Sequence, residues 1–100
     1  MVKHIILWQL KDGLSNEEKT EVLKGIKEGL EGLKGIVPEI IDLHVQTEKL
    51  ESSNADVMLD STFATEEDLK KYAVSPEHVK VANEKVRPFT KTRTCMDFEV

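Results

Sequence analysis

The first strand-like segment, residues 2–10, is apolar on both of its faces, and this constrains the fold more than any other feature. Side chains alternate along an extended chain, so one face carries Val2, His4, Ile6, Trp8 and Leu10, and the other carries Ile5 and Leu7. A strand that is apolar on both faces needs a covering layer on each side. Helices can supply one layer, and we expect a second sheet to supply the other.

Local signals place the remaining elements. Ser15 and Glu18 have the spacing of a capping box and predict the start of a helix, and Gly35 fits the residue after its C-cap. Alternation of apolar and polar residues predicts strands at 40–47, 55–64 and 92–100. Thr65 and Ser75 each fit the start of a further helical segment. The segment that begins at Ser75 is expected to end at Arg87-Pro88-Phe89.

Three glycines follow one side of the first predicted helix. Gly25, Gly29 and Gly32 lie beside the apolar stripe of Leu23, Ile26, Leu30 and Leu33. Glycine costs up to ~1 kcal/mol against alanine inside a helix. Three explanations stay open: close approach of another backbone, room for a ligand, or a helix that tolerates the cost.

The order strand, helix, strand, strand, helix, strand predicts an α+β, ferredoxin-like β-α-β-β-α-β domain over residues 1–100. Its four-stranded antiparallel sheet would carry helices on one face only. The open face is expected to hold Ile5, Leu7, Ile41, Leu43 and Val45. We therefore expect a homodimer in which two open sheet faces pack together, forming a dimeric α/β barrel.

Composition excludes several kinds of partner. With 14 basic and 19 acidic residues the net charge is -5, and no basic cluster is present, so nucleic acid is not an expected partner. No apolar run approaches the ~20 residues of a membrane span. Cys95 is the single cysteine, which fits a reducing cytoplasm. The histidines His4, His44 and His78 are far apart and lack metal-site spacing, so neither a metal nor a cofactor is expected.

Residues 72–79 place an ionisable ring at a helix start. Ser75 fits the N-cap, Pro76 the first and His78 the third helical position. The helix start disfavours positive charge, so a neutral imidazole near pH 7 is expected, able to accept a proton or a hydrogen bond. Tyr72 would supply a phenol to the same place. In the alternative, His78 faces solvent and Tyr72 packs at an edge.

Several sequence blocks together resemble the stress-responsive A/B-barrel (Dabb) family over almost the whole chain. They are Met1-Val-Lys-His4-Ile-Ile-Leu, Ser75-Pro76-Glu-His78-Val79, Val86-Arg87-Pro88 and Met96-Asp97-Phe98-Glu99. The family usually has His-Pro-x-His where this chain has Ser75. The resemblance implies a homodimer whose sheets face each other. One plant member of the family is a polyketide cyclase. The resemblance implies that its catalytic tyrosine and histidine correspond to Tyr72 and His78, and that one of its pocket histidines corresponds to His4. A second pocket histidine of that enzyme is replaced by Val57 in this chain.

These observations predict a pocket between sheet and helices that binds a small apolar or polyketide-like molecule, with no specific activity assigned. Its expected lining residues are His4, Ile6, Trp8, Val57, Leu59 and Val81. His4 has an alternative role as a core histidine bonded to a backbone carbonyl. A second hypothesis is a cyclase-like or proton-transfer enzyme in which His78 removes a carbon-bound proton and Tyr72 donates to the developing enolate. A third is a stress-protective structural oligomer.

Overall fold

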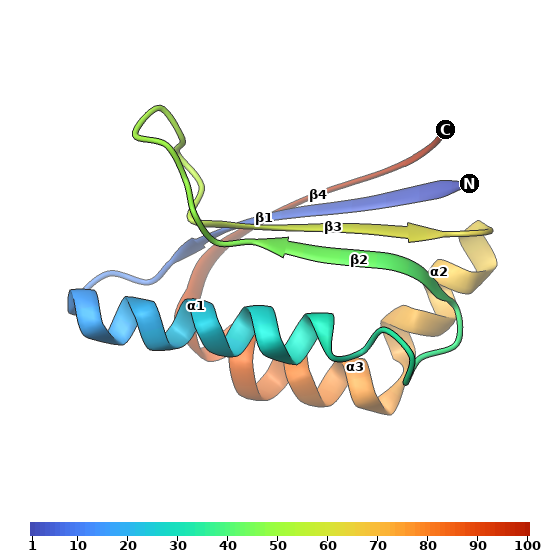
Figure 1. Cartoon of the computed structure of the whole chain (residues 1–100), viewed down its shortest axis with the longest axis horizontal. Coiled ribbons are helices and arrows are strands. Elements are labelled where there is room, and N and C mark those ends of the chain that lie inside the picture. Colours follow the sequence, from blue (N-terminus) through green and yellow to red (C-terminus); the bar gives the residue numbers. More distant parts are fainter.

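The computed structural model describes residues 1–100 and confirms the predicted α+β, ferredoxin-like order (Figure 1). The elements are β1 (Val2–Leu10), α1 (Asn16–Glu31), β2 (Ile40–Gln46), β3 (Val57–Phe63), α2 (Glu66–Val74), α3 (Pro76–Val81) and β4 (Thr90–Glu99). A π-helical turn, η1 (Ala82–Val86), and a 3₁₀ turn, η2 (Arg87–Phe89), connect α3 to β4. None of the helices combines the length and apolar character needed to cross a bilayer.

The four strands form one antiparallel sheet in the order β2-β3-β1-β4. All helices lie on the same side of this sheet, and its other side is open (Figure 1). β1 is a central strand because it pairs with both β3 and β4. β4 is an edge strand, and it is exposed along almost all of its length. The helices cover only one of the two apolar faces of β1, so the apolar side chains of its other face lie on the open side of the sheet.

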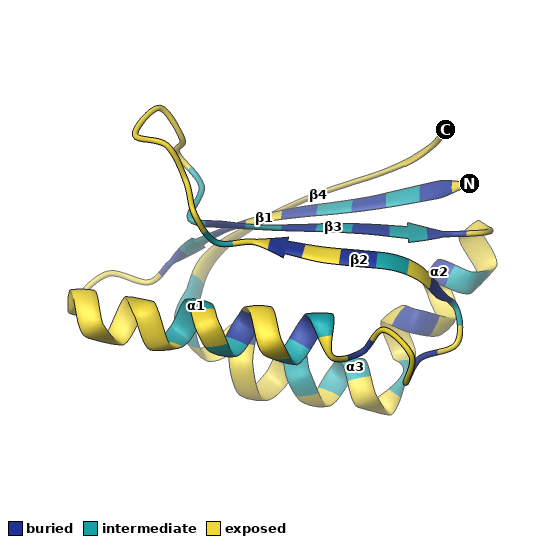
Figure 2. Cartoon of the chain, viewed as in Figure 1, coloured by how far each residue is buried: buried dark blue, intermediate teal, exposed yellow.

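The core lies between the helix-side face of the sheet and α1, α2 and the turn that follows α3. Buried and less buried residues alternate along β1 and β3, as the period of a strand requires (Figure 2). On β3, the residues Val57, Leu59, Ser61 and Phe63 are at most 2% exposed. Ser61 is polar, but its hydroxyl donates to the His4 carbonyl at 2.9 Å, which satisfies it.

The predicted orientation of β2 is wrong for two residues. Leu43 and Val45 are buried with the core on the helix side, not on the open face. A bulge causes this change: Ile40 pairs with Phe63, but Asp42 pairs with Thr62, so Ile41 is an extra residue. One extra residue moves every later side chain to the opposite face of the sheet. The open face keeps Ile5 and Leu7 of β1 and gains Met96 and Phe98, which the register places opposite Ile5 and Lys3.

The N-terminal signals of the helices are confirmed, but the end of α1 is not. The amide of Glu18 donates to Ser15 Oγ at 3.1 Å, and the amide of Ser15 donates to Glu18 Oε1 at 3.0 Å. α1 ends at Glu31 with Gly32 as its C-cap, two residues before the C-cap at Lys34 that the prediction for Gly35 implies. Gly35 instead occupies a turn with φ of +92°, a conformation that glycine adopts without strain.

Replacing two of the three helix glycines with alanine is expected to change the free energy of unfolding in opposite directions. A Cβ on Gly29 would lie 2.9 Å from Val81 Cγ1, whereas a Cβ on Gly25 would lie 3.6 Å from the flexible Lys85 side chain. Gly29 thus permits the close approach of α3, which was one of the three open explanations. We expect Gly29→Ala to lower the free energy of unfolding by about 1–3 kcal/mol through overpacking. Gly25→Ala should raise it by up to ~1 kcal/mol.

Urea unfolding of both variants tests this prediction. The double variant Gly29→Ala with Val81→Ala removes the clashing methyl groups and should recover part of the loss, because the two sites are in contact. Equal stabilities for the two single variants would contradict the close approach of α3 to α1.

Candidate functional site

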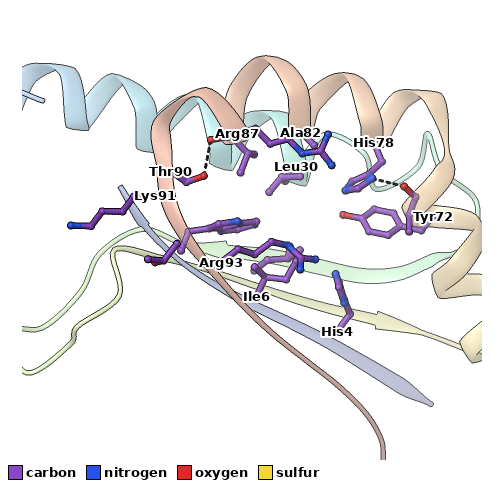
Figure 3. Close-up of a pocket in the computed structure, with 15 residues that line it drawn as sticks. His4, Ile6, Leu30, Tyr72, His78, Ala82, Arg87, Thr90, Lys91 and Arg93 are labelled. Atoms are coloured by element: carbon purple, nitrogen blue, oxygen red, sulfur yellow. Dashed lines mark hydrogen bonds between the residues drawn. The ribbon is translucent and has the colours of Figure 1, made fainter. Parts of the chain in front are cut away.

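A cavity of about 390 Å³ lies between the helix-side face of the sheet and the segment from α2 to η2 (Figure 3). Its apolar lining consists of Ile6, Trp8, Leu30, Leu59, Ala73, Ala82 and Val86. Three groups with titratable rings, His4, Tyr72 and His78, line the same space. A mostly apolar cavity with a few convergent polar groups has the usual composition of a small-molecule site.

Tyr72, on α2, holds the central position among these rings. It is 1% exposed, and its ring centroid lies 4.3 Å from that of His78 and 6.2 Å from that of His4. The hydroxyl is buried without a hydrogen-bond partner, and it points into the cavity (Figure 3). Burial raises the pKa of the Tyr72 phenol, so this group stays a protonated hydrogen-bond donor.

His78 is fixed by the start of α3. Its amide donates to Ser75 Oγ at 3.2 Å, which confirms Ser75 as N-cap, and Pro76 is the first residue of the helix. Nδ1 lies 3.1 Å from the Ala73 carbonyl oxygen (Figure 3). A carbonyl only accepts, so Nδ1 carries the proton and Nε2 of the neutral ring is left as a free acceptor.

The neutral state of His78 has a different main cause from the one predicted. Burial lowers the pKa of the imidazole, and the positive charges of Arg87 and Arg93 lower it further, although the hydrogen bond to Ala73 opposes them. The cause predicted from the sequence was the helix start instead. Both arguments give a neutral proton acceptor near pH 7.

The lowered pKa of His78 predicts a pH-dependent stability. Below the ordinary pKa of 6.5 the unfolded chain binds a proton that the folded chain does not, so the free energy of unfolding should fall as the pH falls. This loss is complete once the folded protein is protonated as well. Urea unfolding as a function of pH measures it. His78→Asn keeps a donor for Ala73 but does not titrate, so it should flatten this part of the profile; an identical slope in both proteins would contradict the assignment.

His4 lies between the cavity and the edge of the sheet. It is 7% exposed, and its Nδ1 contacts the Asp97 carboxylate on β4. The predicted alternative, a core histidine bonded to a backbone carbonyl, is therefore wrong in its partner: a carboxylate takes that place. His44 lies far from this group on β2, where its Nε2 is 3.0 Å from Asp42 and the ring is exposed.

Two expected lining residues lie outside the cavity. Val57, the first residue of β3, is 2% exposed in the core and pairs with Trp8. Val81 is turned toward α1, where it packs beside Gly29. The other expected residues, His4, Ile6, Trp8 and Leu59, line the cavity together with Tyr72 and His78.

The positive charges at the cavity were not predicted from the sequence. Arg87, Lys91 and Arg93, which we call the cationic rim, line it from η2 and β4 and are exposed. Lys91 pairs with Asp12 and Arg87 bonds Asn83, whereas Arg93 has no carboxylate within salt-bridge distance. Charged residues at alternate positions of β4 were visible in the sequence, but only the packed structure places them at the cavity.

The fold and the cavity define the class: a ferredoxin-like α+β domain with a small-molecule-sized cavity between its sheet and helices. The chain belongs to the stress responsive A/B barrel domain family, whose model matches residues 2–100. No curated protein matches the chain significantly.

Solved structures share the fold. A dimeric protein of unknown function from Bacteroides fragilis is 32% identical with a TM-score of 0.92, covering 99% of this chain and 95% of that one. A dimeric ferredoxin-like protein of unknown function from Thermobifida fusca is 18% identical (TM-score 0.78; 99% and 90% covered). A hydroxynitrile lyase from Passiflora edulis is 20% identical (TM-score 0.72; 97% and 90% covered). The last two likenesses show the fold alone.

Proposed function

We propose that the cavity binds a small molecule with an apolar, polyketide-like body and an oxygen group that accepts a hydrogen bond from Tyr72. The observation that carries this proposal is the buried Tyr72 hydroxyl, which has no partner within the protein. Leaving such a group unpaired costs about 1–3 kcal/mol, and a bound oxygen acceptor would recover it. The apolar lining accounts for the body of the ligand.

The cationic rim favours a ligand that carries an acidic group. Arg93 has no carboxylate partner within the protein, and the cavity has no acidic residue in its lining. Arginine binds a carboxylate with two parallel hydrogen bonds, which also orients the ligand. An alkylated aromatic carboxylic acid combines these properties and serves as the probe.

Tyr72→Phe is expected to separate binding from stability. The variant removes an unsatisfied hydroxyl, so the free energy of unfolding should stay equal or rise by up to ~1 kcal/mol. Binding of the probe should weaken by about tenfold, the value of one hydrogen bond. Trp8 is the only tryptophan and lines the cavity, so its fluorescence reports binding. The uncharged amide of the probe is the control ligand, because it tests the contribution of the cationic rim. Unchanged affinity in Tyr72→Phe would overturn the proposal.

A second candidate function is proton transfer, as in a cyclase-like enzyme that uses Tyr72 and His78. Support comes from the free Nε2 acceptor of a neutral His78 and from the adjacent phenol, with 4.3 Å between ring centroids. His78 would remove a proton from carbon beside a carbonyl group, and Tyr72 would donate to the enolate oxygen. Deuterium exchange into a β-dicarbonyl acid tests this proposal. The rate of exchange catalysed by His78→Asn should be at least about 100-fold lower than that of the wild-type protein. His44→Asn is the control; equal exchange in both variants would exclude His78.

We also infer that the chain forms a homodimer through its open sheet face. Support comes from Leu7, Met96, Ile41 and Phe98, large apolar side chains that are 37–66% exposed on strands. Similar solved proteins are described as dimeric. The expectation of a stress-protective structural oligomer stays a prediction, because no feature of the site favours it over ligand binding.

A further inference from the structure

Three metal-ligating side chains of different chemistry meet at the free edge of the sheet. They are His4 of β1 and Cys95 and Asp97 of β4, and one ligand atom from each lies within 4.8 Å of the other two. Cys95 Sγ is 3.8 Å from His4 Nδ1 and 3.5 Å from Asp97 Oδ1, and His4 Nδ1 also contacts Asp97 Oδ1. We propose that this His4–Cys95–Asp97 cluster binds a divalent transition metal ion of the zinc type.

The sheet holds these residues in place. His4 lies directly opposite Asp97 in the antiparallel ladder, and Cys95 is opposite the next residue on the same face, Ile6. Side chains two positions apart on a strand point to the same side, so Cys95 and Asp97 both project beside His4. The His4 ring is nearly buried and lies in edge contact with Tyr72 and Phe63, at 6.2 and 6.5 Å. The cluster is thus mostly organised before a metal arrives.

The distances suit tetrahedral coordination. Zinc bonds of about 2.3 Å to sulfur and about 2.0–2.2 Å to nitrogen and oxygen put tetrahedral ligand atoms roughly 3.4–3.6 Å apart. The two sulfur distances, 3.8 and 3.5 Å, are already close to this range. Only the contact between His4 Nδ1 and Asp97 Oδ1 must widen to admit an ion. Thiolate, imidazole and carboxylate together favour zinc or cobalt over magnesium and calcium, which prefer oxygen ligands alone.

Three protein ligands leave a fourth position for water or a small ligand, as in zinc sites that are not purely structural. A second cavity of about 520 Å³ borders the cluster and is lined in part by Val2, Leu69 and Ala73. Glu66, Lys70, Arg93 and Glu99 also line it, so two further negative and two positive charges surround the ion. Metal binding must displace the thiol proton of Cys95, so the affinity should rise with pH.

Cobalt(II) gives the sharpest test, because a thiolate bond to cobalt produces a near-ultraviolet charge-transfer band. The untagged, reduced protein should bind one Co²⁺ per chain with this band, and Zn²⁺ should displace it. Cys95→Ser should abolish the band, and Asp97→Asn should weaken binding by more than about 100-fold, since loss of an outer-shell partner alone costs 10–100-fold. Both residues are exposed on the edge strand, so the core stays intact.

His44→Asn is the matched control. His44 also contacts an aspartate, Asp42, but has no cysteine beside it, and its removal should leave the band and the stoichiometry unchanged. Absence of stoichiometric binding, or a band that persists in Cys95→Ser, would overturn the proposal. This test does not depend on the proposed ligand of the Tyr72 cavity, because Tyr72→Phe should retain cobalt binding.

Discussion

Replacing Phe63 with alanine is expected to lower the free energy of unfolding by about 3–5 kcal/mol, a large part of the stability of a domain of this size. Phe63 is fully buried at the end of β3, and its ring lies 5.0 Å from that of Tyr72 and 6.5 Å from that of His4. The variant loses buried apolar surface and leaves a cavity beneath the site. We therefore expect weaker binding of the acidic probe as well, because Tyr72 loses the surface that positions it.

Phe89→Ala is the control for this prediction. Phe89 is only half-buried, and Lys11 Nζ lies 5.4 Å from its ring centroid, an exposed contact worth about 0.5–1 kcal/mol. Urea unfolding should rank Phe63→Ala well below Phe89→Ala in stability. Similar losses for the two variants would contradict the position of Phe63 at the centre of the core.

Replacing Leu7 with aspartate is expected to separate the dimer into monomers. Leu7 is in the middle of the central strand, on the open face that we infer to be the interface. A two-fold axis places the same substitution in the interface twice. If each buried carboxylate costs about 2 kcal/mol, the dissociation constant rises by about a thousandfold. Sedimentation equilibrium over a range of protein concentrations measures this change.

Ile36→Asp serves as the comparison for the dimer. Ile36 is 59% exposed and lies in the turn between α1 and β2, outside the four strands. This variant should keep the dimer, which shows that an added charge alone does not dissociate it. A dimer that persists in Leu7→Asp would place the interface elsewhere. A monomeric wild-type protein would remove the inference altogether.

Local sequence signals predicted the structure correctly where interactions between neighbouring residues determine it. The capping pair Ser15 and Glu18, the N-caps Thr65 and Ser75, and the alternation along β1 and β3 are each determined within a few residues, and all are found in the structure. The bulge at Ile41 and the early end of α1 at Glu31 were missed. Both depend on how β2 and the turn before it fit against the remaining core, which no local pattern describes.

The order of the elements and the family could be predicted from local patterns and motifs, whereas the meeting of Tyr72 and His78 was predicted beside an alternative in which His78 faces solvent. Three features of the sites exist only in the packed chain: Tyr72 has no hydrogen-bond partner, the cationic rim borders its cavity, and His4 meets Cys95 and Asp97. His4 and Asp97 are 93 residues apart and become neighbours through strand pairing. Burial and long-range register are properties of the packed sheet, and they set the chemistry of both sites.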